Sequence, residues 1–135
     1  MTGRFEAVIA AIDAANDADP ARIMADGVER PAATLYGERM SACLAYLAPD
    51  AGELVRIAVR AQHLERFNLP RVAYPMNKVG YYRWRNEQKR RHAERLTELM
   101  RASGFEEAEA ARAAAIVRKD NLRADADAQL LEDCA

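Results

Sequence analysis

The sequence predicts an all-α fold, a single compact bundle of about six helices that covers residues 1–135. Apolar side chains recur every three or four residues along most of the chain, which is the spacing of one helical face. No alternation typical of strands, no repeat and no low-complexity tract is apparent in the pattern. A chain of 135 residues has the size of one ordinary domain and can bury a hydrophobic core.

The first half of the chain is expected to form three helices. The first covers about 3–16, and turn residues between 19 and 31 then indicate an irregular crossing. The second runs over about 33–48 and ends before Pro49, because proline disfavours helical geometry in the residue before it. The third covers about 51–65. The buried residues of the second helix are expected to be Leu35, Tyr36, Met40, Cys43, Leu44 and Leu47.

The second half is expected to begin with a loop and continue with three helices. The loop FNLPRVAYPMNKVG (67–80) is rich in large apolar side chains, namely Phe67, Tyr74 and Met76, and is expected to pack down. A long helix over about 78–102 ends near Gly104, a residue favoured just beyond helix ends. Helices over about 105–119 and from 125 to the terminus follow. The last helix lacks a stop signal, which leaves a homo-oligomer open.

Composition and charge limit the classes of protein to which this chain is expected to belong. Half of the residues are apolar, 30% are charged, and the formal net charge is −1, as in a soluble globular protein. No apolar run reaches the ~20 residues that a membrane-spanning helix needs, so no membrane association is predicted. The amino-terminal pattern is interrupted by charges, unlike a signal peptide. Cys43 and Cys134 lack metal-site spacing and are interpreted as reduced thiols of a cytoplasmic protein.

Charge is distributed unevenly along the chain. Residues 56–91 include ten basic and two acidic residues, which leaves ten basic and nineteen acidic residues elsewhere. A basic middle between acidic ends predicts a local site for an anion. The alternative is that exposed helix faces happen to be rich in arginine, and the sequence does not decide between the two.

One stripe of the long helix changes from apolar to polar. At about 100° per residue, the stripe comprises Tyr81, Arg85, Gln88, His92, Leu96 and Leu99. Leu96 and Leu99 indicate that it faces the core. Buried polar groups need hydrogen-bond partners or they cost a few kcal/mol each. The polar half is therefore either a satisfied structural network or the wall of a polar cleft, and we favour the cleft.

Three dispersed residues have side chains that suit a divalent metal ion. Two imidazoles and a carboxylate are typical ligands of a transition metal, with water in the open positions. The two histidines of the chain are His63 and His92, and the carboxylate is expected to be Asp133, with Glu132 as an additional candidate. The site depends on the fold, because these residues are far apart in the sequence. No G-x-G-x-x-G, phosphate-binding loop, G-x-S-x-G or paired C-x-x-C motif is present.

Short blocks spread over the chain resemble domain-of-unknown-function family 4202. They are LYGERM (35–40), RAQH (60–63), PRVAYPM (70–76), GYYRWR (80–85), HAER (92–95), RK (118–119) and LED (131–133). The similarity covers essentially the whole chain, and the YPM and GYxxWR patterns are distinctive. The resemblance implies that these blocks belong together, and it implies no activity.

At greater distance, the order of the helices resembles the HD-domain superfamily of metal-dependent phosphohydrolases. AVRAQHLERF is similar to the segment that carries the His-Asp doublet, with His63 in the place of the histidine, and LEDCA is similar to the segment of the closing aspartate, Asp133. Met40 stands where the first histidine would be, and Leu64 where the aspartate of the doublet would be. The resemblance therefore implies an HD-like bundle with a single metal ion at most.

Two functions follow from these observations. The first is a mononuclear metal-dependent hydrolase of a small anionic, phosphorylated substrate, in which the metal ion lowers the pKa of bound water. Its metal ligands are expected to be His63, His92 and Asp133. The groups expected to act in catalysis are Tyr81, Arg85, Gln88 and Lys89, and those expected to bind the substrate are Arg71, Arg118 and Lys119.

The alternative is a non-catalytic helical module that binds an anionic ligand through a basic cleft. The ligand would be a nucleotide, an RNA segment or an acidic partner, and its binding would depend steeply on salt. A purely structural role as an interaction subunit is also left open.

Overall fold

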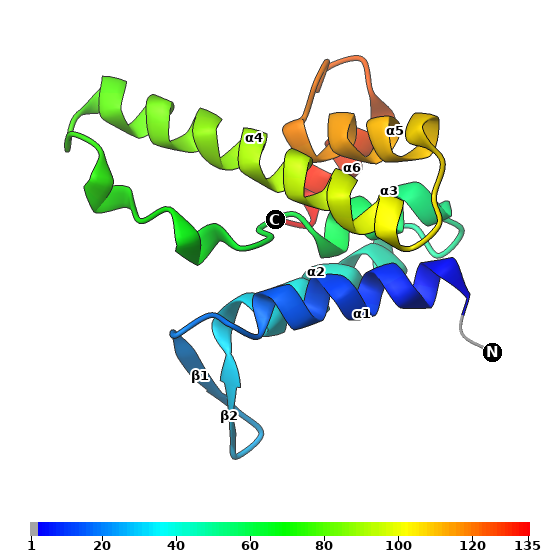
Figure 1. Cartoon of the computed structure of the whole chain (residues 1–135), viewed down its shortest axis with the longest axis horizontal. Helices are drawn as coiled ribbons and strands as arrows, with labels where there is room; N and C mark the ends of the chain where they lie inside the picture. The colour runs from blue at the N-terminus through cyan, green and yellow to red at the C-terminus, as the bar shows by residue number, and fades with distance from the viewer. Residues whose placement is uncertain (1–2) are drawn as a thin grey trace.

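The structure, a computed structural model, describes residues 3–135 (Figure 1). Its elements are α1 (Arg4–Asn16), β1 (Arg22–Ala25), β2 (Val28–Pro31), α2 (Ala32–Leu47), α3 (Glu53–Arg60), η1 (Arg66–Asn68), η2 (Arg71–Ala73), α4 (Lys78–Ala102), α5 (Glu107–Arg118) and α6 (Ala126–Asp133), where η denotes a 3₁₀ helix. The predicted mostly helical domain is confirmed. None of the described helices is long and apolar enough to cross a membrane.

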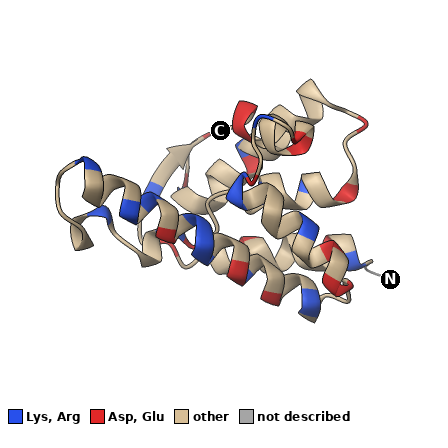
Figure 2. Ribbon diagram, turned by 90° about the horizontal axis from the view of Figure 1, so that it is seen from above, with Lys and Arg blue, Asp and Glu red and all other residues tan. Residues whose placement is uncertain are grey.

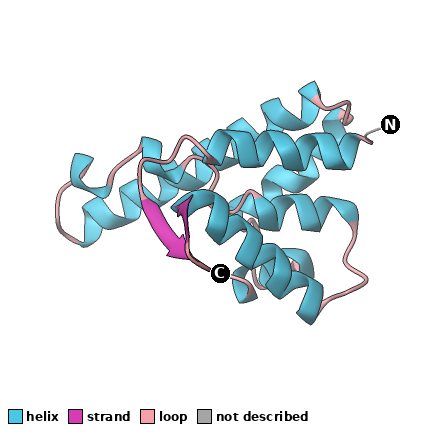
Figure 3. Ribbon diagram, turned by 90° about the horizontal axis from the view of Figure 1, so that it is seen from below, coloured by secondary structure: helices cyan, strands magenta, loops and turns pink. Residues whose placement is uncertain are grey.

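The crossing predicted between the first two helices is instead a β-hairpin, drawn in magenta in Figure 3. Its strands are antiparallel, with Arg22 opposite Pro31 and Ala25 opposite Val28. The two turn residues between them, Asp26 and Gly27, have φ of 51° and 76°. Positive φ at both central residues is what a tight type I′ hairpin requires, and Asp-Gly is a preferred pair for it. The prediction of an irregular segment was therefore wrong.

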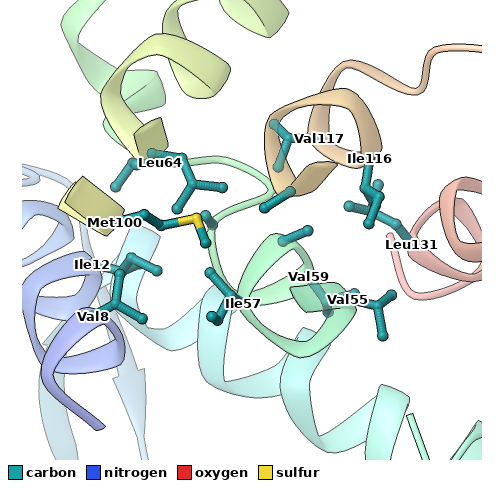
Figure 4. Packing of buried hydrophobic residues seen from close by; sticks show 14 of the residues in the cluster. Val8, Ile12, Val55, Ile57, Val59, Leu64, Met100, Ile116, Val117 and Leu131 are labelled. Carbon is teal, nitrogen blue, oxygen red and sulfur yellow. The ribbon is translucent and has the colours of Figure 1, made fainter. Parts of the chain in front are cut away.

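Helix α3 lies at the centre of the fold and contacts α1, α2, α5 and α6. Its residues Ile57, Ala58 and Val59 have no exposed surface, so the helix is buried around most of its circumference. Figure 4 shows the apolar side chains that surround it, with Met100 of α4 on one side and Ile116 of α5 on the other. Full burial of such a side chain contributes about 1.5–3 kcal/mol, and this core holds the helices in place around α3.

Helix α2 buries a narrower stripe than the sequence indicated. Leu35, Met40 and Leu44 are buried, but Tyr36 and Leu47 are 44% and 48% exposed. The physical reason is that α2 packs on α3 and α1 along one side, and within residues 3–135 no other helix packs on it to a similar extent. The two cysteines are free thiols; Cys134 is buried and Cys43 is partly buried.

The first half of α4 extends beyond the body of the protein, and the chain that precedes it runs alongside (Figure 1). We call residues 66–88 the arm. Asn77 begins α4 by accepting a hydrogen bond from the Gly80 N–H at 2.7 Å, and Gly104, with φ of 98°, follows its end. Figure 2 shows basic positions gathered at the free end of the arm, whereas basic and acidic positions alternate along the rest of α4.

The arm is held together largely by hydrogen bonds from side chains to backbone carbonyls. Trp84 Nε1 donates to the Leu69 carbonyl at 2.8 Å. The Arg71 guanidinium donates to the carbonyls of Tyr74 and Pro75 at 3.2 and 2.9 Å. Met76, which was expected to pack down, is 70% exposed. The loop is therefore ordered mainly by its polar contacts, and the prediction for Met76 was wrong.

Candidate functional site

The stripe predicted on α4 enters the protein as expected. Gln88 and His92 are each only 5% exposed, and Leu96 is fully buried. Arg85 is partly buried, and Tyr81 lies at the edge with 40% of its surface exposed. The same helical face that contributes to the core thus turns polar toward the arm.

A cavity of about 260 Å³ opens along this polar half, between α4, the end of α3, and the ends of α5 and α6. Seven of the ten predicted site residues line it: His63, Tyr81, Arg85, Gln88, Lys89, His92 and Lys119. These side chains come from three different parts of the chain, and the packing of α5 on both α4 and α3 brings them together. The polar stripe therefore forms one wall of a cavity, as predicted.

Three predicted site residues do not line this cavity. The Arg71 guanidinium is occupied by the carbonyls of the loop around it. Arg118 is exposed and pairs with Asp120 at 3.1 Å. Asp133 is exposed and accepts a hydrogen bond from Gln129 at 2.9 Å. Consecutive residues on a helix differ by about 100° in direction, so the carboxylate that faces the cavity from α6 is the preceding one, Glu132.

The two histidines lie close together as neutral rings. Their ring centroids are 6.5 Å apart. Burial lowers the pKa of His92 to about 4, against the opposing effect of its hydrogen bond to the Leu64 carbonyl. Burial, Arg66 and Lys119 lower the pKa of His63 to about 4. His92 Nδ1 lies 2.7 Å from the Leu64 carbonyl oxygen, which only accepts, so Nδ1 carries the proton and Nε2 retains its lone pair.

The residues present do not fit the predicted metal ion. Two neutral imidazoles are suitable ligands, but Asp133 lies away from them, and Glu132 is paired with Lys119. Within residues 3–135, no three histidine, cysteine, aspartate or glutamate side chains are grouped so that they could hold a metal ion. Metal-dependent hydrolysis at His63, His92 and Asp133 stays a prediction from the sequence.

Positive charge predominates in the lining of the cavity. Arg66, Arg85, Lys89 and Lys119 face a single carboxylate, Glu132. Lys119 and its neighbours Arg85 and Lys89 lower the pKa of Glu132, with the Lys119 hydrogen bond as the largest cause. Burial, Arg85 and Lys119 lower the pKa of Lys89. At Lys89, the repulsion by Arg85 and Lys119 therefore exceeds the attraction of Glu132.

Gln62 is a buried polar side chain of the cavity wall, and its amide has no partner among the described residues. It is 4% exposed, and neither its Nε2 nor its Oε1 has a hydrogen-bond partner within residues 3–135. The other lining amide, Gln88, donates to the carbonyls of Arg66 and Leu69 at 3.0 and 3.1 Å. A buried donor or acceptor without a partner costs about 1–3 kcal/mol, so a group that paired with the Gln62 amide would stabilise the protein by that order of free energy.

Four important lining residues were missed from the sequence or left undecided. Trp84 lies four positions before Gln88 and eight before His92, on the same face of α4. The helical spacing in the sequence was therefore sufficient to predict that Trp84 lines the cavity. Gln62 and Arg66 lie beyond the end of α3, where the periodicity ends. Glu132 differs from the predicted Asp133 by one position. For these last three, only the three-dimensional packing identifies the side chain that faces the cavity.

A second, more apolar cavity of about 310 Å³ adjoins the first. Tyr36, Met40 and Cys134 contribute to its lining, and it shares His63 and Arg66 with the first cavity. Tyr36, although partly exposed, therefore lines this cavity. Since His63, Arg66 and Ala135 line both cavities, a cationic cavity and a more apolar cavity lie next to each other.

Comparison with known proteins identifies the family of this chain. Searches of curated proteins and of solved structures returned no match, so the distant resemblance to HD domains has no support. The model of a domain of unknown function, DUF4202, matches residues 6–135, from the third residue of α1 to the end of α6 and beyond. The chain belongs to the DUF4202 family.

Proposed function

We propose that this protein binds a small phosphorylated molecule in the cationic cavity. One observation carries the proposal: four cationic side chains line a cavity of about 260 Å³ that contains one carboxylate. A phosphate group carries about −1.5 to −2 charges and three acceptor oxygens at neutral pH. It supplies both the charge and the acceptors that these side chains lack.

The cations are available to a ligand. Arg66, Arg85 and Lys89 take part in none of the ion pairs formed among the described residues, unlike Lys119, which is paired with Glu132. Arg85 and Lys89 are also partly buried, so a bound anion would be screened less by salt than on an open surface. Hydrogen bonds between such cations and phosphate are stronger than neutral ones.

Binding is favoured over proton-transfer catalysis by the state of the histidines. A general base works best when its pKa is near the operating pH. His63 and His92 have pKa values of about 4, so both are weak bases in the ligand-free protein. As neutral rings they do offer hydrogen-bond acceptors, which suits recognition of a hydroxyl or amine on the ligand.

Replacing Arg85 or Lys89 by methionine is expected to weaken phosphate binding. Each hydrogen bond between charged groups contributes about 1.5–3 kcal/mol, so each variant should lose roughly tenfold or more in affinity. Methionine keeps most of the side-chain length and removes the charge. The measurement is isothermal titration calorimetry with ribose 5-phosphate and with pyrophosphate at low salt.

Arg83→Met is the matched control, because Arg83 is exposed on the same helix and does not line the cavity. It should bind both probes as the wild type does. Thermal melts of the ligand-free variants should be close to wild type, since Arg85 and Lys89 form no ion pair within residues 3–135. Absence of binding to any phosphorylated probe, or an equal loss in all three variants, would contradict the proposal.

A further inference from the structure

We infer that the bound molecule is a nucleotide and that Gln62 recognises its base. The inference rests on the proposed function, because it takes phosphate binding by the cationic cavity as given. It adds the chemical class of the ligand and a residue that determines specificity. The argument starts from the unpaired amide of Gln62.

Both polar atoms of Gln62 lack a partner in the part of the chain that the structure describes, although the side chain lies in the wall of the cavity. Its backbone is fixed, since its N–H donates to the Val59 carbonyl at 3.3 Å at the end of α3. Neither amide atom reaches solvent in the ligand-free structure. Rotation of the side chain toward the cavity would give both atoms a partner when a suitable ligand is bound, and the relief of an unpaired donor and acceptor favours that rotation.

To pair both of its polar atoms, the amide of Gln62 needs a ligand that presents a donor and an acceptor side by side. A phosphate group at neutral pH offers acceptors, so it can satisfy Nε2 of Gln62 but leaves Oε1 unpaired. A nucleobase offers both on one edge, and glutamine pairs with adenine through two such hydrogen bonds, at N6 and N7. The requirement of Gln62 is therefore met by a base and is not met by the phosphate alone.

The adjoining cavity supplies room for the flat faces of a base. His63 follows Gln62 in the chain and is shared by the cationic and the apolar cavity, and Met40 and Tyr36 line the apolar side. The volumes of about 260 and 310 Å³ together fall in the range of ~300–1,000 Å³ that is typical of small-ligand pockets. The two adjoining cavities thus offer a phosphate region, an amide for the base edge and an apolar region beside it.

The test compares adenosine 5′-monophosphate, ribose 5-phosphate and adenosine by isothermal titration calorimetry with the full chain. The nucleotide should bind more tightly than either fragment. Gln62→Leu should weaken nucleotide binding by about tenfold or more and leave ribose 5-phosphate binding unchanged. It should also raise the melting temperature of the ligand-free protein, because it removes an unpaired buried amide. Titrations with the other three nucleoside monophosphates then rank the affinities for the four bases.

Gln129→Leu, at an exposed glutamine of α6, is the control and should leave all affinities unchanged. Gln62→Met, which is unbranched, replaces Gln62→Leu if the latter does not fold. Equal affinities for nucleotide and ribose 5-phosphate, or a loss of both in the Gln62 variant, would overturn this inference and leave the proposed function intact. Failure of every phosphorylated probe to bind would overturn both.

Discussion

Acidification from pH 7 to pH 4 is expected to lower the free energy of unfolding by roughly 3 kcal/mol or more. The cause is the pair of buried neutral rings, His63 and His92, whose pKa values in the folded protein are about 4. In the unfolded chain both would titrate near 6.5, the ordinary value. Between these limits the unfolded chain binds more protons than the folded protein, so stability decreases as the pH falls and is independent of these two groups above pH 6.5.

The carboxylates act in a different pH window. Arg112 and backbone N–H groups hold the pKa of Asp125 at about 2, and Lys119 lowers that of Glu132 from the ordinary 4.5. Their stabilising effect is present above their unfolded pKa and is lost only as the pH falls below about 4.5. The slope between pH 6.5 and 4.5 therefore reports on the histidines.

Urea denaturation at several pH values between 7 and 4.5 measures this slope. His92→Asn keeps a donor that can reach the Leu64 carbonyl but does not titrate, so its slope should be about half that of the wild type. The His63→Asn, His92→Asn double variant should show almost no slope in this window. Slopes equal to the wild type in both variants would refute the assignment.

Gly80→Ala is expected to destabilise the arm by about 2 kcal/mol or more, as overpacking does. A Cβ atom at Gly80 would lie 2.0 Å from the Pro75 carbonyl oxygen and 2.8 Å from its carbonyl carbon. Both contacts are with backbone, so the loop before α4 must move. Because the arm contributes Trp84 and Arg85 to the cavity, ligand binding should also be lost.

Gly52→Ala is the matched control for this experiment, because a Cβ atom there meets nothing within 4 Å. Thermal melts and tryptophan fluorescence distinguish the two variants, since Trp84 is the only tryptophan of the chain and lies in the arm. The Gly80 variant should melt lower and show a changed emission, and the Gly52 variant should match the wild type. Identical behaviour of the two variants would show that the loop adapts without cost.

A helix could be predicted wherever apolar residues recurred with helical spacing over a long stretch and a helix-ending residue followed. Helix α4 was predicted at 78–102 with Gly104 after it, and the structure has the same bounds. The hairpin was not predicted, because its four-residue strands are too short to show a period. The Asp26-Gly27 turn was the available signal. Helix α3 is shorter than predicted: it ends at Arg60, and the predicted stretch up to 65 forms turns that close at the left-handed Glu65, with φ of 54°.

The site was predictable as far as one helix could define it. The wheel of α4 placed Arg85, Gln88 and His92 on the correct face without any knowledge of its neighbours. What lies opposite that face depends on contacts between distant segments, which a single sequence does not reveal. The eight-residue helix α6 is too short for its pattern to decide between Glu132 and Asp133.

Three side chains of α4, Trp84, Gln88 and His92, bind the preceding segment through the carbonyls of Leu69, Arg66 and Leu64. A carbonyl is present whatever the residue type, so these contacts specify the path of the main chain and not the side chains along it. Substitutions at exposed positions of this segment should be tolerated in random mutagenesis, whereas insertion or deletion of a single residue should shift the carbonyls out of register and abolish folding of the arm.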